Sequence, residues 1–170
     1  MSRTWTIENY EYSTLTAGET FSLRMLLGFS TSANLVAATL DGNDVCECED
    51  GWSRYSTTGN CYQYFSSEET WEDAQSYCQN LGAELASVTT EGENDFLTTL
   101  TQERAFVGGY KDDTDTWQWS DGSTWDYTNW STGQPDDAQG MQGYAVINYK
   151  DDGSWDDEWY TATYPFICEK

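Results

Sequence analysis

The chain has 170 residues, of which 38% are hydrophobic and 16% aromatic, so it can bury one ordinary hydrophobic core. Seven basic residues against thirty acidic ones give a formal net charge of -23, which would repel nucleic-acid phosphates and anionic lipid headgroups. From this charge we expect no nucleic-acid partner. The sequence contains no His, which excludes Ser/His/Asp and Cys/His catalytic sets and Cys2His2 zinc sites, so we expect no enzymatic activity.

Residues 1–45 alternate between apolar and polar side chains in short steps, most clearly at 20–25 and 35–40, and this pattern predicts strands. A turn at 41–44 follows, so we expect a strand-rich N-terminal extension of unknown role at 1–45 and a separate domain at 46–170. The longest apolar stretch, 25–40, is too polar to span a bilayer, which predicts no membrane insertion. The first twenty residues lack an apolar leader, so we expect that a leader was removed or that the natural start lies upstream.

Two helix-start signals follow in chain order. Ser66 and Glu69 have the spacing of a capping box, and apolar residues at three- and four-residue steps then continue until Gly82, which predicts a first helix beginning at Ser66. Thr90 and Glu93 form a second box and predict a second helix. The expected buried residues are Trp71, Ala74, Cys78 and Leu81 in the first helix, and Phe96, Leu97 and Leu100 in the second.

From residue 106 onward the chain consists of short apolar segments separated by Gly-rich loops, which is typical of strands. Helices followed by strands indicate an α+β domain rather than alternating βαβ units. Five cysteines without any His favour disulfides over zinc, and disulfides persist in secreted or lumenal proteins. We therefore expect a secreted protein.

The landmarks from Cys48 onward resemble the C-type lectin-like family in their order and spacing. They are Cys48-x-x-Gly51-Trp52, Cys61-Tyr62, Trp71-x-x-Ala74-x-x-x-Cys78, Phe106-Val107-Gly108-Gly109, Trp119-x-Asp121-Gly122-Ser123, Tyr127-x-Asn129-Trp130, Gln134-Pro135-Asp136, Trp155-Asp156-Asp157 and Phe166-Ile167-Cys168-Glu169. The resemblance implies a C-type lectin-like fold, with two helices, small antiparallel sheets and a long calcium-binding loop. It does not by itself imply a function, since many domains with this fold bind neither sugar nor calcium.

The resemblance to the long form of the family also implies two disulfides, Cys48 with Cys61 and Cys78 with Cys168. Cys46 would then be unpaired or form an interchain disulfide, which would make the protein a disulfide-linked homo-oligomer. Pairing of Cys46 rather than Cys48 with Cys61 remains an alternative.

The family's second conserved disulfide, which ties the calcium loop, is missing from this chain. Tyr144 and Tyr160 stand at its two positions, and we expect the two rings to pack against each other. Without the disulfide the long loop would be less constrained.

In sugar-binding members of the family, oxygen ligands around a cis proline hold Ca2+, and vicinal sugar hydroxyls complete its coordination shell. Carried over residue by residue, the resemblance implies metal ligands Gln134, Asp136, Gln142, Asp156 and Asp157, with Pro135 cis. It implies sugar contacts from Gln134, Asp136, Gln142, Asp156 and Trp159. Gln142 replaces the usual Glu and Asp156 the usual Asn, so three carboxylates remain, which is enough charge for calcium.

Further acidic and aromatic residues lie near these motifs. Asp112, Asp113 and Asp115 are candidates for a possible auxiliary metal site. The residues Trp117, Trp119, Trp125 and Trp130 resemble an exposed stacking platform, but at the family's positions we expect them to belong to the core of the loop region.

By resemblance, the Gln-Pro-Asp order implies galactose-type hydroxyls, although Ala138 stands where galactose binders usually carry a stacking Trp. We therefore expect calcium-dependent binding of galactose or N-acetylgalactosamine-type glycans, with weak single sites that act through multivalency. Two alternatives stay open: a lectin-fold domain that binds protein or ice without a sugar site, and a structural calcium-binding module.

Overall fold

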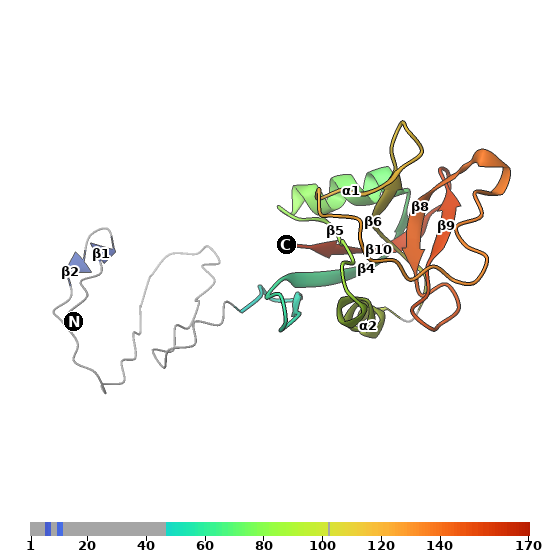
Figure 1. Cartoon of the computed structure of the whole chain (residues 1–170). Coiled ribbons are helices and arrows are strands. Elements are labelled where there is room, and N and C mark those ends of the chain that lie inside the picture. Colours follow the sequence, from blue (N-terminus) through green and yellow to red (C-terminus); the bar gives the residue numbers. More distant parts are fainter. Residues whose placement is uncertain (1–5, 8–9, 12–46, 102) are drawn as a thin grey trace. The chain divides into compact units, whose positions relative to one another are not determined.

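The computed structural model describes residues 6–7, 10–11, 47–101 and 103–170 (Figure 1). The chain divides into two units, Met1–Val45 and Cys46–Lys170. In the first unit, strands β1 (Thr6–Ile7) and β2 (Tyr10–Glu11) pair in antiparallel fashion. The strands predicted at 20–25 and 35–40, and Cys46 with its predicted pairing, lie outside the described residues.

The second unit is built on one sheet whose strands follow the order β3-β4-β10-β6-β8-β9. These strands are β3 (Ser53–Arg54), β4 (Cys61–Glu69), β6 (Ala105–Lys111), β8 (Gln142–Ile147), β9 (Asp156–Trp159) and β10 (Tyr164–Glu169). Two short strands, β5 (Glu84–Leu85) and β7 (Trp117–Trp119), pair with β10 and β6. With helices α1 and α2, this sheet confirms the predicted α+β class.

Helix α1 spans Trp71–Asn80, and its N-cap is Thr70, whose hydroxyl accepts the backbone N–H of Asp73. The predicted start at Ser66 is therefore wrong. Residues 61–69 instead form β4, in which Phe65 pairs with Phe166 of β10. A full ladder of sheet hydrogen bonds outweighs a local capping signal.

The end of α1 lies at the predicted place, with Gly82 in the left-handed region just beyond the C-cap residue Leu81. Leu81, which we expected to be buried, is 43% exposed because it caps the helix rather than facing the sheet. The other three predicted residues, Trp71, Ala74 and Cys78, are buried.

Helix α2 spans Glu91–Leu100 and begins as predicted, with the Thr90 hydroxyl accepting the backbone N–H of Glu93. The carboxylate of Glu93 turns back to Thr89, accepting its N–H at 2.6 Å and its hydroxyl at 3.0 Å, so the box closes one residue earlier than predicted. Leu97 is fully buried, while Phe96 and Leu100 are half-buried and pack against the same core.

The core lies on both faces of the sheet, and β10 contributes to each face in turn. Phe166 and Cys168 join the cluster that α1 covers with Trp71, whereas Ile167 between them joins the cluster that contains Leu97 of α2. This alternation follows from the two-residue period of a strand. Figure 1 shows α1 and α2 on opposite sides of β4 and β10.

Two disulfides join the elements of this unit. Cys48 is bonded to Cys61 at the start of β4, and Cys78 of α1 to Cys168 of β10, with Cα–Cα distances of 5.7 and 5.5 Å. These are the pairs that the resemblance implies. In the described part of the chain, no helix has the length and apolar character needed to cross a membrane.

Candidate functional site

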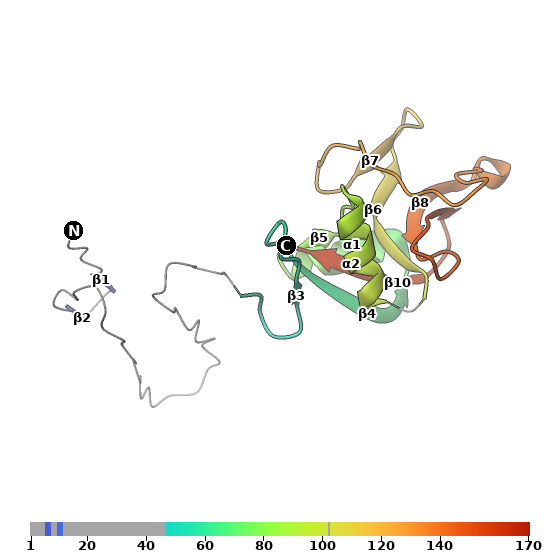
Figure 2. The same ribbon diagram turned by 60° about the horizontal axis from the view of Figure 1, so that its bottom comes forward.

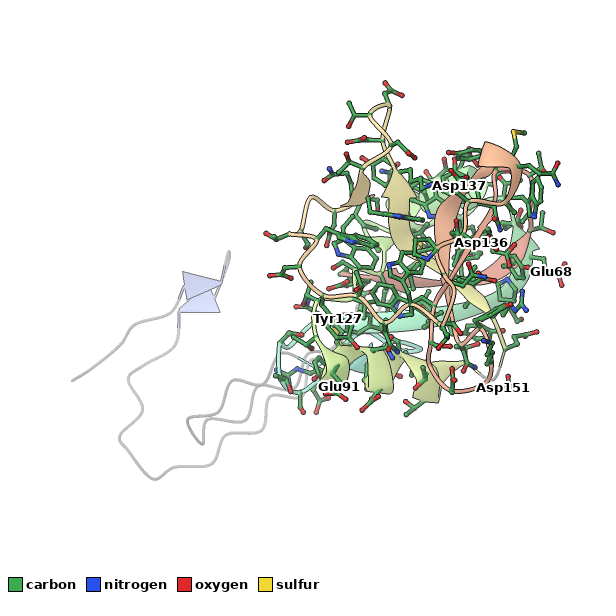
Figure 3. All side chains as sticks on the ribbon, turned by 45° about the vertical axis from the view of Figure 1, so that its right-hand side comes forward. Glu68, Glu91, Tyr127, Asp136, Asp137 and Asp151 are labelled. Atoms are coloured by element: carbon green, nitrogen blue, oxygen red, sulfur yellow. A yellow bond between two sulfur atoms is a disulfide. The ribbon has the colours of Figure 1, made fainter. Side chains whose placement is uncertain are left out.

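The predicted calcium and sugar residues lie in the segment between β7 and β8, at the first residue of β8 and in β9. Figure 3 labels one of them, Asp136. Figures 1 and 2 both place β8 at the end of the second unit that lies away from the C terminus. Trp130 and Trp155 form a parallel bridge, the N–H of Ser131 donates to the carbonyl of Trp155, and the N–H of Gln134 donates to the carbonyl of Ser131. These bonds anchor the loop that carries Gln134 to the start of β9.

Asp157 holds the tip of this loop. Its carboxylate is fully buried and accepts the backbone N–H groups of Asp136 and Asp137, each at 2.9 Å. The Gln134–Pro135 peptide bond, which precedes these two residues, is cis, as predicted. Asp157, expected as a metal ligand, is thus also the anchor that fixes the backbone of the loop against β9.

Gln142, the first residue of β8, closes the loop from its other side. Its backbone N–H donates to the carboxylate of Asp137 at 3.2 Å. Its side-chain oxygen accepts the N–H of Ala138, and its amide group donates to the carbonyl of Asp157. A carboxylate can only accept, so the Glu that the family carries here could not make the bond to the Asp157 carbonyl. Gln142 therefore completes a network that links the loop, β8 and β9.

Two acceptor oxygens in the predicted ligand set are buried without a hydrogen-bond partner: Oε1 of Gln134 and Oδ1 of Asp156. Asp156 is only 5% exposed. Burial, together with the charges of Glu158 and Asp157, raises the pKa of its carboxyl to about 6, against the influence of Arg104. A buried acceptor without a partner is unfavourable, so a ligand that bonded either oxygen would stabilise the site. Neither oxygen is engaged by the chain itself.

The acid of β9 that follows Asp157, Glu158, differs from Asp156 because one of its oxygens, Oε1, accepts two hydrogen bonds. Its carboxylate accepts from Arg104 at 3.0 Å and from the Tyr164 hydroxyl at 2.8 Å. The guanidinium of Arg104 also lies 4.3 Å from the ring centroid of Tyr149. Glu158, which is itself buried, therefore belongs to a partly buried ion pair with Arg104 and not to the candidate ligand set.

The predicted ligand set fits a calcium ion in its donor chemistry. All of its side-chain donors to a metal would be carboxylate or amide oxygens, which are the ligands that calcium prefers, and two of those oxygens have no partner in the structure. Among the described residues, no group of three or more His, Cys, Asp or Glu side chains is placed to hold a metal ion. Calcium at this set would therefore need the amide oxygen of Gln134 beside the carboxylates.

Two of the three acids proposed for an auxiliary metal site, Asp112 and Asp115, make other contacts. Asp112 accepts from both N–H and hydroxyl of Thr114, from the N–H of Thr116 and from Gln118. Asp115 forms an ion pair with Lys111, at 3.2 Å. Asp113 is exposed, and no side-chain hydrogen bond to it is present in the described part of the chain.

The prediction that Tyr144 and Tyr160 pack together is confirmed, with ring centroids 5.2 Å apart and perpendicular planes. Tyr144 also stacks on Trp71 of α1, with centroids 4.8 Å apart. Gly143 makes room for this arrangement, because a Cβ atom there would overlap the Tyr160 ring. Aromatic packing thus joins β8 to the end of β9 where the family's second disulfide is missing.

Most of the tryptophans near the site pack into the hydrophobic core. The predicted core role of the four tryptophans is confirmed, since Trp119 is buried and the other three are half-buried against the same cluster as Trp155. Trp159, a predicted sugar contact, is half-buried and pairs directly with Gln142 across β8 and β9.

Two residues of the site were not predicted from the sequence, Asp137 and Lys111. Asp137 is bonded to Asp157 and Gln142 as described above, and its carboxylate lies 3.1 Å from the ammonium of Lys111. The sequence shows Asp137 only as one acid of a pair. Lys111 is distant in the sequence from both loop and β9, so no local pattern signals its role.

Comparisons with known proteins agree with this architecture. Residues 67–170 match the family described as Lectin C-type domain. A protein named Lectin from Pleurodeles waltl is 37% identical over 134 residues, which cover 72% of this chain and 76% of that protein. Ladderlectin from Oncorhynchus mykiss is 33% identical over 118 residues, which cover 65% of this chain and 61% of ladderlectin, so the match spans less than two thirds of that relative.

Among solved structures, a Ca2+-dependent type II antifreeze protein in its Ca2+-free form is 31% identical, and the alignment covers 72% of this chain and 99% of that protein with a TM-score of 0.66. The family match covers the loop and the Cys78–Cys168 disulfide. The chain therefore belongs to the C-type lectin domain family.

Proposed function

We propose that this protein binds carbohydrate with the help of calcium, through the loop that carries Gln134 and Asp136 and the adjoining residues of β9. The observation that carries the proposal is the pair of buried acceptor oxygens without partners, on Gln134 and Asp156. The adjacent acid, Asp157, differs because both of its oxygens accept backbone N–H groups.

Each residue of the set has a role that its environment permits. Gln134 and Asp156 would contribute their free oxygens to the ion, and Asp136 its exposed carboxylate. Calcium, when bound, supplies a centre to which two neighbouring sugar hydroxyls coordinate. Around it, the Gln134 amide can donate a hydrogen bond to a hydroxyl and the Asp136 carboxylate can accept one. Trp159 offers a half-buried ring at the end of β9.

The galactose class of sugars rests on the order of amide and acid around Pro135. With Gln134 before and Asp136 after the proline, the donor and the acceptors face the sugar in the order opposite to that of a Glu-Pro-Asn sequence. We therefore expect the site to prefer galactose and N-acetylgalactosamine. The disulfides fit a secreted protein, and weak single sites would act together on clustered glycans.

A second candidate function is binding of protein or ice without sugar. The hydrogen bonds of Gln142 and Asp157 favour it, since they hold the loop with groups of the chain itself. The similarity to a solved calcium-independent type II antifreeze protein, 26% identical with a TM-score of 0.67, points the same way. This candidate predicts binding that a calcium chelator does not remove.

Calorimetry with galactose, N-acetylgalactosamine and mannose, each with calcium and with EGTA, separates the two candidates. The proposal expects galactose-type binding in calcium only. A double variant, Gln134→Glu with Asp136→Asn, should shift the preference toward mannose because it reverses the order of amide and acid. Asp126→Asn is the matched control, since Asp126 is exposed and lies outside the loop. If none of the three sugars binds in calcium, the proposal fails, and freezing-point depression then tests ice binding.

A further inference from the structure

Lys111 is a buried cation at the edge of the candidate site. It is the last residue of β6, and its side chain is only 8% exposed. Its ammonium lies 3.1 Å from the carboxylate of Asp137 in the loop and 3.2 Å from that of Asp115 in the turn after β6. The same ammonium lies 5.7 Å from the ring centroid of Trp117. One positive charge thus joins two acidic segments of the chain.

This lysine is held in its charged form. Burial acts to lower the pKa of Lys111, but the hydrogen bonds to Asp137 and Asp115 outweigh burial and raise that pKa. A lysine whose side chain is 8% exposed is favourable only while its ammonium is paired, so its position and that of Asp137 depend on each other.

Through Asp137 the lysine acts on the whole loop. The carboxylate of Asp137 that meets Lys111 also accepts the N–H of Gln142, and the N–H of Asp137 donates to Asp157. Asp137 adopts a left-handed backbone conformation, with φ of 44°. A non-glycine residue keeps this conformation only where its surroundings fix it. The contacts with Lys111, Gln142 and Asp157 are what fix it here.

We propose that Lys111 serves as an internal cation in the place of an auxiliary metal ion, holding the 134–142 loop to the 112–116 turn without calcium. A metal bound between turn and loop would need the oxygens of Asp115 and Asp137, and the lysine already neutralises both. Asp112 offers no alternative, because donors of its own turn engage its carboxylate. Lys111 is thus a positioning residue for the loop, whether or not the loop binds sugar.

Hydrogen exchange of single amides in EGTA tests this role on the intact chain. The N–H groups of Asp137 and Gln142 should be protected without calcium in the wild type. Lys111→Gln should speed their exchange about tenfold, and Lys111→Arg should restore most of the protection because it keeps the charge. Amides of β10 should exchange at the wild-type rate in both variants, which shows that the core is intact.

Two results would overturn the proposal. The first is rapid exchange of the Asp137 and Gln142 amides in the wild type in EGTA, a measurement that does not depend on any variant folding. The second is slower exchange of the Thr114 and Thr116 amides when calcium is added, because that would reveal a metal in the turn. Neither result depends on sugar binding, so the proposed carbohydrate site can fail while this inference stands.

Discussion

Two carboxylates, the half-buried Glu169 at the end of β10 and the buried Asp156 at the candidate site, differ in how the fold satisfies their oxygens. Glu169 of β10 accepts from Asn60 and the Tyr62 hydroxyl on one oxygen, and from both the N–H and the hydroxyl of Ser87 on the other. Asp156 of β9 is more deeply buried, yet one of its oxygens has no partner. A buried acid with every oxygen bonded ties elements together, whereas an unsatisfied one is available to a ligand.

The same difference separates the regions around them. Between α1, β4 and β10, packing is apolar and aromatic and a disulfide joins the helix to the last strand. Around the loop, the contacts are hydrogen bonds between charged side chains and backbone amides. The first region should therefore determine global stability, and the second should respond to calcium, pH and local substitutions.

The largest expected effect is on the core region. Replacing Cys78 and Cys168 by Ala opens a loop of 90 residues and should lower the free energy of unfolding by roughly 4 kcal/mol on the loop-entropy account. Urea unfolding in EGTA measures the change. The matched variant is Cys48 and Cys61 to Ala, which opens a loop of 13 residues and should lower stability less. Equal losses would contradict the assignment of the longer disulfide as the main covalent link.

The next largest effect should come from Asp157. Asp157→Ala leaves the amides of Asp136 and Asp137 without their acceptor and should lower the free energy of unfolding by about 2 kcal/mol. It should also abolish the thermal stabilisation by calcium, because the anchor of the loop is lost. Thermal melts with and without EGTA test both parts. Calcium stabilisation at the wild-type level would show that the loop is held by other contacts.

Asp156 should give a smaller effect that depends on pH. Its carboxyl pKa is raised from 3.8 to about 6, so between these values the folded state binds more protons than the unfolded state. In EGTA, its contribution to stability is therefore fully present below pH 3.8 and is lost as pH rises through about 6. Asp156→Asn removes this dependence and should raise stability at pH 7 by about 1 kcal/mol.

The control for this prediction is the wild type in calcium. There the stability should fall as pH is lowered, the reverse of the dependence in EGTA, because protons compete with the metal for Asp156. Burial also raises the pKa of Glu169, so the difference between Asp156→Asn and wild type, and not either curve alone, isolates Asp156. If the free energy of unfolding changed with pH in the same way for both proteins in EGTA, Asp156 would not be an unsatisfied buried acid.

The smallest expected effect concerns the aromatic pair at the missing disulfide. Tyr160 is 40% exposed, so Tyr160→Ala should lower the free energy of unfolding by less than about 1 kcal/mol. Gly143→Ala should be more harmful than Tyr160→Ala, because its Cβ would overlap the Tyr160 ring. In the double variant the overlap is gone, and the harm of Gly143→Ala should largely disappear. Additive losses would mean that the ring is not what limits Gly143.

The sequence alone determined the features that depend on neighbouring residues or on the order of motifs. The cap at Thr90, the end of the first helix near Gly82 and the buried face at Trp71, Ala74 and Cys78 follow from helical spacing. The resemblance of the motifs to the C-type lectin-like family also implied the two disulfide pairs and the cis bond before Pro135. Local spacing failed at Ser66, where a capping pattern lies in a strand whose partner is β10.

Only the tertiary structure decided which charges meet and which oxygens remain free. Lys111 and Asp137 lie on separate segments, and nothing near either residue in the chain indicates the other. Likewise, Asp156 and Asp157 are adjacent in sequence, yet one has an unpartnered oxygen and the other accepts two backbone amides. The order of motifs predicts which residues border the loop, because these residues are read along the sequence. Partners and burial depend on how distant segments pack, and they decide what each carboxylate can bind.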